Sequence, residues 1–132
     1  MKRFEGQYKA EVLSLSAIRS DVGNFLTKEC DLDTARTGDF QILVGEVLQN
    51  IIRYEYLING VEGHIHIEII CNGQGIQIRV VDDAPPLKDI SFLSRSPVAS
   101  EHGGMGLELI RNLSKAYTIN PFSYGNEHLI TI

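Results

Sequence analysis

Residues 64–83, HIHIEIICNGQGIQIRVVDD, contain the pattern that is most informative about the fold. Polar and apolar residues alternate up to Ile69, a turn sequence follows at Asn72–Gly75, and the alternation resumes from Ile76. Because the side chains of a strand point alternately to its two faces, a period of two predicts strands with one buried face. The stretch therefore predicts a β-hairpin, which the Ala-Pro-Pro segment at residues 84–86 ends.

The segments on either side of this hairpin predict helices and a second hairpin. Apolar residues recur at helical spacing in Ser16–Glu29 and from about Thr37 to Ile58, and Gly104–Lys115 predicts a third helix. Tyr117–Phe122 and His128–Ile132 predict the second hairpin. Because strands and helices come in separate groups, we expect a two-layer α+β sandwich, with the helices on one face of a mixed, largely antiparallel sheet.

The length, composition and net charge of the chain limit the classes of protein to which it can belong. With 132 residues, 43% of them apolar, the chain is expected to form a single domain over residues 1–132 with a core of its own. A net charge of -5 disfavours nucleic-acid binding. No apolar run approaches the length of a membrane span or signal peptide, so a cytoplasmic location is expected. Cys30 and Cys71 are expected to be reduced, largely buried thiols, and no Cys/His cluster indicates zinc.

A polar arc on the second helix, formed by Gly45, Glu46, Gln49, Asn50 and Arg53, carries the first candidate site. Winding the segment at about 100° per residue places Glu46 and Asn50 one turn apart, at the edge of this arc beside Leu43. The pair suits a pocket for a metal-bound phosphate, because an amide oxygen ligates Mg²⁺ and a carboxylate accepts a proton. Taken alone, the pair favours the simpler alternative, a solvated helix face.

Asp82 and Asp83 end the second strand of the hairpin. By alternation Asp82 shares a face with the apolar residues of that strand, so it points inward if this face packs on the helices, whereas Asp83 points to water. An inward carboxylate needs a hydrogen-bond donor or a proton, and the exocyclic amine of a purine is such a donor. A turn whose carboxylates cap local backbone N–H groups explains the two residues equally well.

The third candidate site is the glycine cluster of residues 102–107, HGGMGL, which opens the third helix. Glycines let the backbone approach a ligand closely, and the free N–H groups of a helix start attract phosphate. Neither a P-loop nor a Rossmann motif is present. A flexible hinge is the alternative explanation.

The ExxxN pair, the strand ending in aspartate, the following loop and the glycine cluster together resemble the GHKL ATPase superfamily. The likeness runs from the first helix to the last hairpin, and its most specific parts are VGEVLQNIIRYEY at residues 44–56 and HGGMGLELI at residues 102–110. Within this superfamily the chain is most similar to the anti-sigma-factor serine/threonine kinases. The resemblance implies the Bergerat ATP-binding fold, with ATP and Mg²⁺ as cofactors.

The resemblance also implies a role for each matching residue. Glu46 matches the residue that activates the attacking group, Asn50 the Mg²⁺ ligand, and Asp82 the aspartate that recognises adenine. Residues 89–102 match the ATP lid, in which Arg95 is expected to supply positive charge, because His102 stands where the family often has arginine. The ATP-binding residues implied in this way are Asn50, Arg53, Asp82, Arg95, Gly103, Gly104, Met105, Gly106 and Leu107.

The implied function is that of a partner-switching, anti-sigma protein kinase. Such a kinase uses ATP to phosphorylate a serine or threonine of a STAS-type antagonist, and it sequesters a sigma factor or a similar client. A homodimer through the sheet is expected, with an alternating strand such as His64–Ile70 as one candidate for the interface.

Two other functions stay open. Ala84 and Pro86 replace glycines of the usual motif, which motivates a catalytically degenerate module that binds a partner without phosphoryl transfer. An isolated ATPase or histidine-kinase-type domain is less well supported, because the sequence has no helical dimerisation module with a phosphoacceptor histidine.

Overall fold

The computed structural model describes residues 1–90 and 107–132. Five strands lie in these residues: β1 (Lys2–Lys9), β2 (His64–Asn72), β3 (Gly75–Asp82), β4 (Ala116–Phe122) and β5 (Gly125–Thr131). The helices are α1 (Leu15–Glu29), α2 (Thr34–Ile51) and α3 (Leu107–Leu113), with a short 3₁₀ turn η1 (Val12–Ser14) and a π-helical segment η2 (Ile52–Leu57). Arg95 and the glycine cluster at residues 103–106 lie outside the described residues.

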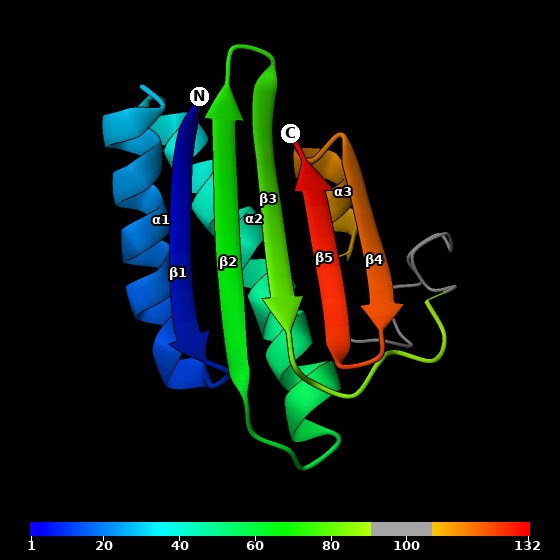
Figure 1. Ribbon diagram of the computed structural model, residues 1–132. Helices are drawn as coiled ribbons and strands as arrows, with labels where there is room; N and C mark the ends of the chain where they lie inside the picture. The colour runs from blue at the N-terminus through cyan, green and yellow to red at the C-terminus, as the bar shows by residue number, and fades with distance from the viewer. Residues whose placement is uncertain (91–106) are drawn as a thin grey trace.

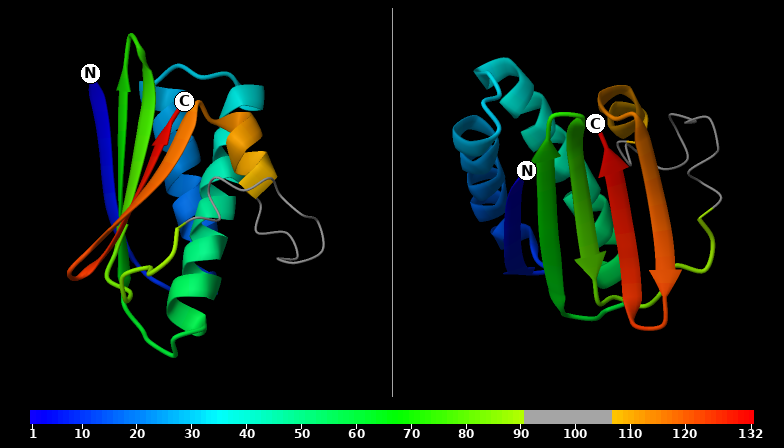
Figure 2. Two further views of the ribbon diagram at one scale, coloured as in Figure 1. Left: turned by 90° about the vertical axis from the view of Figure 1, so that its right-hand side faces the viewer. Right: turned by 45° about the horizontal axis from the view of Figure 1, so that its top comes forward.

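The strands form one sheet in the order β1-β2-β3-β5-β4, and the helices cover one of its faces, which confirms the two-layer α+β class (Figures 1 and 2). Every strand pairing is antiparallel, so no mixed sheet is found in the described part of the chain. β2 pairs with both β1 and β3, so the candidate strand His64–Ile70 is an inner strand that could join a homodimer only through its outer face. The edges of this sheet are β1 and β4.

The second helix begins earlier than expected and changes its winding near its end. The side chain of Asp33 accepts a hydrogen bond from the backbone N of Arg36 at 2.7 Å, so this N-cap starts α2 at Thr34 rather than near Thr37. η2 continues α2, and the N–H of Ile58 donates to the carbonyl of Arg53, five residues earlier. The C-terminal end of this combined helix lies at the same end of the fold as the C-terminal end of β3 (Figure 1).

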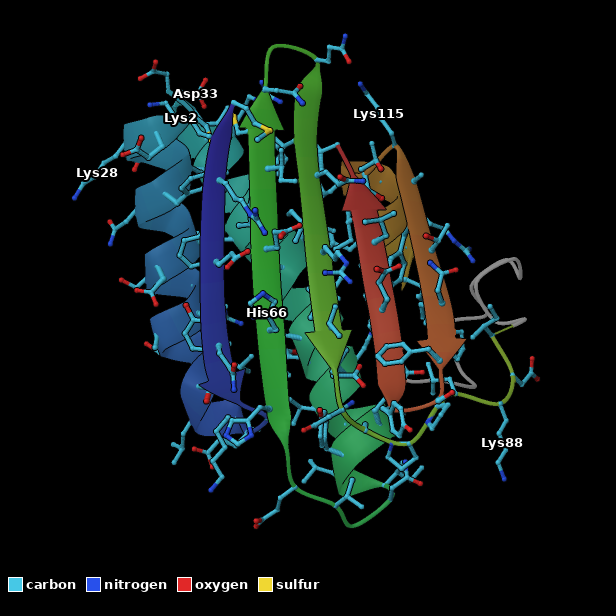
Figure 3. All side chains as sticks on the ribbon, in the orientation of Figure 1. Lys2, Lys28, Asp33, His66, Lys88 and Lys115 are labelled. Carbon is cyan, nitrogen blue, oxygen red and sulfur yellow. The ribbon has the colours of Figure 1, made fainter. Side chains whose placement is uncertain are left out.

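The core fills the space between the sheet and the helices. The inward residues of the β2–β3 hairpin are fully buried or nearly so, as the alternation predicted, and they pack on apolar residues of α1 and α2. Figure 3 shows the opposite face of the sheet, from which the labelled His66 projects. Among the described residues, no helix combines the length and the apolar character that a membrane span requires.

Candidate functional site

The two residues of the first candidate site, Glu46 and Asn50, lie on α2 in the position that the sequence predicted. Glu46 and Asn50 are both half-buried at the boundary of the core, whereas Arg53 is exposed. Gly45, assigned to the polar arc, is instead buried against α1, where an added Cβ would lie 3.1 Å from the guanidinium of Arg19. The boundary position of Glu46 and Asn50 is therefore confirmed, and the composition of the arc is corrected at Gly45.

The two aspartates at the end of β3 point in opposite directions, as the alternation predicted. The Asp82 side chain is buried, with 2% of the residue exposed, and Asp83 is exposed. Asp83 still has a structural task, because its Oδ1 accepts hydrogen bonds from the Tyr56 hydroxyl at 2.6 Å and the His64 backbone N at 3.1 Å. Asp82 Oδ1 accepts from the Ala84 backbone N at 3.1 Å, so one of its oxygens makes the local turn that was the alternative explanation.

A buried polar cluster surrounds the other oxygen of Asp82. Glu55, Asn126 and His128 join Asp82 in it, and none of the four residues is more than 2% exposed. The His128 Nε2 lies 2.9 Å from Glu55 Oε2 and 3.4 Å from Asp82 Oδ2. The cluster thus connects η2, the end of β3 and the inner face of β5.

The amide of Asn126 holds the cluster together. Its Nδ2 donates to Glu55 Oε1 at 2.8 Å, to Asp82 Oδ1 at 3.1 Å and to the Pro85 carbonyl at 3.1 Å. Its Oδ1 accepts from the backbone N of Leu87 at 2.8 Å. One side chain therefore positions both carboxyl groups and the segment that follows β3.

Burial and mutual contact shift the pKa of each titratable group here. Burial raises the pKa of Glu55 to about 8, against the opposing effect of His128. Burial also works to raise the pKa of Asp82, but contacts with His128, Glu55 and Asn126 outweigh it and hold that pKa below its ordinary value. Burial works to lower the pKa of His128, but the two carboxyl groups raise it. The lowered pKa favours the ionised form of Asp82 near neutral pH.

Asp82 Oδ2 is short of hydrogen-bond donors. It is buried and makes no hydrogen bond in the described structure. The single N–H on His128 Nε2 can point to only one carboxyl group, and Glu55 is the nearer of the two. A buried carboxylate oxygen in this position can accept a hydrogen bond from a ligand amine or bind a cation.

Sequence reasoning missed Glu55, Asn126 and His128, although two weak signals were present. Glu55 comes one turn after the buried Ile51, on the apolar stripe of the helix. Asn126 and His128 alternate with the buried Ile130, so they share the inner face of β5. A polar residue at a position where the periodicity predicts a buried apolar residue is therefore the sequence signal for this cluster.

Comparisons with known structures agree with this architecture. The RsbU and RsbW domains of Rv1364c from Mycobacterium tuberculosis match with a TM-score of 0.69 and 14% identity, over 99% of this chain and 31% of that one. A blue-light activated histidine kinase of Erythrobacter litoralis, EL346, matches with a TM-score of 0.62 and 18% identity, over 91% of this chain and 40% of that one. At these identities the likeness shows the fold, and this chain spans less than half of either structure.

Comparison of the sequence itself identifies the family. No curated protein matches the chain. Residues 8–130, nearly its whole length, match the histidine kinase-like ATPase domain. This match confirms the resemblance to the GHKL superfamily that the helix, strand and glycine motifs indicated. The chain therefore belongs to the histidine kinase-like ATPase domain family.

Proposed function

We propose that this chain is an ATP-dependent serine/threonine protein kinase that acts as an anti-sigma regulator by partner switching. It phosphorylates a STAS-type antagonist and sequesters a sigma factor or a similar client. Membership of the histidine kinase-like ATPase family supports ATP as the phosphoryl donor. The similarly folded structure that contains an RsbW domain beside an RsbU domain supports a regulatory, partner-switching setting.

The observation that carries the proposal is the buried Oδ2 of Asp82, which makes no hydrogen bond in the described structure and has His128 at 3.4 Å as its ion-pair partner. The 6-amino group of adenine is a neutral donor of the kind this oxygen lacks, and the ionised state favoured for Asp82 makes it a strong acceptor. Because Asp82 lies at the end of a rigid, paired strand, its position is fixed before a nucleotide arrives.

The positions of Glu55, Asn50 and Glu46 along the helix formed by α2 and η2 indicate how a bound nucleotide would be oriented. Glu55 contacts the cluster, and Asn50 and Glu46 come five and nine residues earlier on the same continuous helix. With a rise of about 1.5 Å per residue, these two side chains lie roughly 7 and 13 Å from Glu55 along the helix axis. This axial spacing fits a nucleotide whose base contacts Asp82 and whose phosphates reach the part of α2 that carries Asn50 and Glu46.

Each residue then has a defined task. ATP supplies the phosphoryl group and Mg²⁺ neutralises its charge, with the amide oxygen of Asn50 as a ligand of the ion. Glu46 accepts the proton of the attacking serine or threonine hydroxyl of the partner. Arg53 and Arg95 add positive charge, and the amides of residues 103–107 surround the phosphates. Of these groups, Arg95 and residues 103–106 lie outside the described part of the chain.

Phosphorylation also explains the exchange of partners. A phosphate group brings about two negative charges, and this chain already has a net charge of -5. The modified antagonist is therefore repelled and leaves the kinase free to bind its client. A cytoplasmic homodimer joined through the sheet is part of the proposal.

A second candidate function is a degenerate module that binds partners without phosphoryl transfer. Two observations favour it: Ala84 is 1% exposed where the related motif has a flexible glycine, and Asp82 is in a cluster already filled by protein side chains. Calorimetry with ATP and Mg²⁺ separates the two functions, because the degenerate module gives no binding heat.

Matched aspartate variants test the nucleotide site. Asp82→Asn is expected to weaken ATP binding about 10- to 150-fold, since a hydrogen bond to a charged group contributes about 1.5–3 kcal/mol. Asp83→Asn, the same change one residue later on an exposed side chain, is expected to leave affinity within about twofold. Equal losses in the two variants would contradict the assignment of Asp82.

Phosphoryl transfer tests the catalytic role. Transfer from radiolabelled ATP to a STAS-type protein is expected to disappear in Glu46→Gln while ATP binding is retained. Unchanged transfer in this variant would contradict the role of Glu46.

A further inference from the structure

Three potential metal ligands meet in the buried cluster. The carboxylate oxygens of Glu55 and Asp82 and a ring nitrogen of His128 all lie within 4.8 Å of one another. Each comes from a different element, and each residue is 2% exposed. We propose that Glu55, Asp82 and His128 form a binding site for one divalent transition-metal ion of the zinc class.

The distances suit such an ion. Zinc binds imidazole nitrogen and carboxylate oxygen at about 2.0–2.2 Å in a tetrahedron, which places neighbouring ligand atoms about 3.3 Å apart. The His128 Nε2 lies 3.4 Å from Asp82 Oδ2 and 2.9 Å from Glu55 Oε2. Both distances therefore lie close to the separation expected for two ligands of one ion.

An independent observation points to a ligand at this place. Asp82 Oδ2 is buried, has no hydrogen bond, and faces the other two ligands. One divalent ion would displace the protons held by Glu55 and His128 and would then balance the charge of the two carboxylates. The nitrogen ligand favours zinc and related transition metals over Mg²⁺, which prefers oxygen and keeps its waters.

The residue behind His128 supports its use as a ligand. The hydroxyl of Tyr117 lies 2.8 Å from Nδ1, the ring nitrogen that faces away from the two carboxyl groups. When Nδ1–H donates to this hydroxyl, Nε2 is left unprotonated and directed at the ion. A hydrogen bond of this kind fixes both the tautomer and the ring orientation of a metal-binding histidine.

Metal binding has a regulatory consequence, which rests on the proposed function. The same oxygen of Asp82 cannot ligate an ion and accept the amine of adenine, so metal and nucleotide exclude each other. The site therefore makes nucleotide binding sensitive to free transition metal.

Cobalt and zinc titrations of the nucleotide-free chain test the site directly. The wild-type chain is expected to bind one Co²⁺ with visible d–d absorption, and Zn²⁺ is expected to displace it. His128→Gln is expected to weaken binding more than about 100-fold. His66→Gln, the same change on the outer face of β2, is the matched control and is expected to bind normally (Figure 3).

Several results would overturn the site. They are the absence of binding to the wild-type chain, unchanged affinity in His128→Gln, loss of binding in His66→Gln, or the charge-transfer absorption of a cysteine thiolate. If His128→Gln does not fold, Tyr117→Phe replaces it, with an expected loss of about 10- to 100-fold. Unchanged affinity in Tyr117→Phe would then count against the site.

A competition experiment between ATP and Zn²⁺ distinguishes failure of the metal site from failure of the proposed nucleotide function. ATP affinity is measured with and without Zn²⁺, and tripolyphosphate controls for chelation of the ion by the phosphates. Zinc binding without any ATP binding would refute the nucleotide function and leave the metal site standing. ATP binding without zinc binding would refute the metal site alone, and simultaneous binding of both would refute their exclusion.

Discussion

Replacing Asn126 with alanine is expected to destabilise the fold by about 2–4 kcal/mol. The side chain is fully buried, donates to Glu55 Oε1 at 2.8 Å and to Asp82 Oδ1 at 3.1 Å, and accepts from the Leu87 backbone N. Leu87 is only half-buried, so water can replace the bond to its N–H group. The loss therefore comes mainly from the two buried carboxyl groups, at about 1–3 kcal/mol for each group left unsatisfied. Asp82 Oδ1 keeps the Ala84 N–H, which limits the total.

Urea and thermal unfolding measure this loss. For a chain of this size, about 1 kcal/mol shifts the melting temperature by roughly 3–5 °C, so a decrease of about 6–20 °C is expected. Asn120→Ala is the matched control, because Asn120 is exposed and donates to the half-exposed Glu127 at 3.1 Å. The control is expected to change stability by less than about 0.5 kcal/mol. An Asn126→Ala variant as stable as this control would refute the view that Asn126 organises the cluster.

Three further predictions concern backbone space and thiol reactivity. Gly125→Ala is expected to destabilise the fold by at least about 1–3 kcal/mol, measured by urea unfolding, because the added Cβ would lie 1.9 Å from the Asp82 carbonyl oxygen. Gly38→Ala is expected to stabilise it by about 0.5–1 kcal/mol, because Gly38 lies in α2 with nothing within 4 Å of an added Cβ; a loss of stability would contradict the open space found there. Burial, reinforced by Cys71, raises the pKa of the Cys30 thiol to about 12, so alkylation by iodoacetamide at pH 8 is expected to be much slower than for an unhindered thiol, and rapid modification would contradict the environment described for Cys30.

The hairpin and the direction of Asp82 could be predicted because each has a strong local signal. Alternation fixed which residues of β2 and β3 face the helices, and Asp82 follows the same parity. Helical winding likewise placed Glu46 and Asn50 at the boundary of the core. These features depend on the periodicity of one element at a time, which sequence shows directly.

Features that depend on contacts between distant segments could not be predicted. β1 is an edge strand, and Phe4 and Tyr8 are its only large half-buried side chains. It is held mainly by backbone hydrogen bonds to β2. Because backbone pairing does not depend on a particular residue type, the sequence gives no signal for it. Glu55 and His128 look like surface residues in the sequence, although they lie 73 positions apart and meet in the core. Burial of Glu55 and His128 is tolerated because these two groups satisfy one another.

Recognition of the adenine amine by Asp82 is the contact on which the proposed function depends. Purine riboside triphosphate lacks only the 6-amino group of ATP, so calorimetry of both nucleotides with Mg²⁺ isolates this one contact. ATP is expected to bind about 10- to 150-fold more tightly, the equivalent of one hydrogen bond to a buried charge. Equal affinities for the two nucleotides, or no binding of ATP, would contradict it.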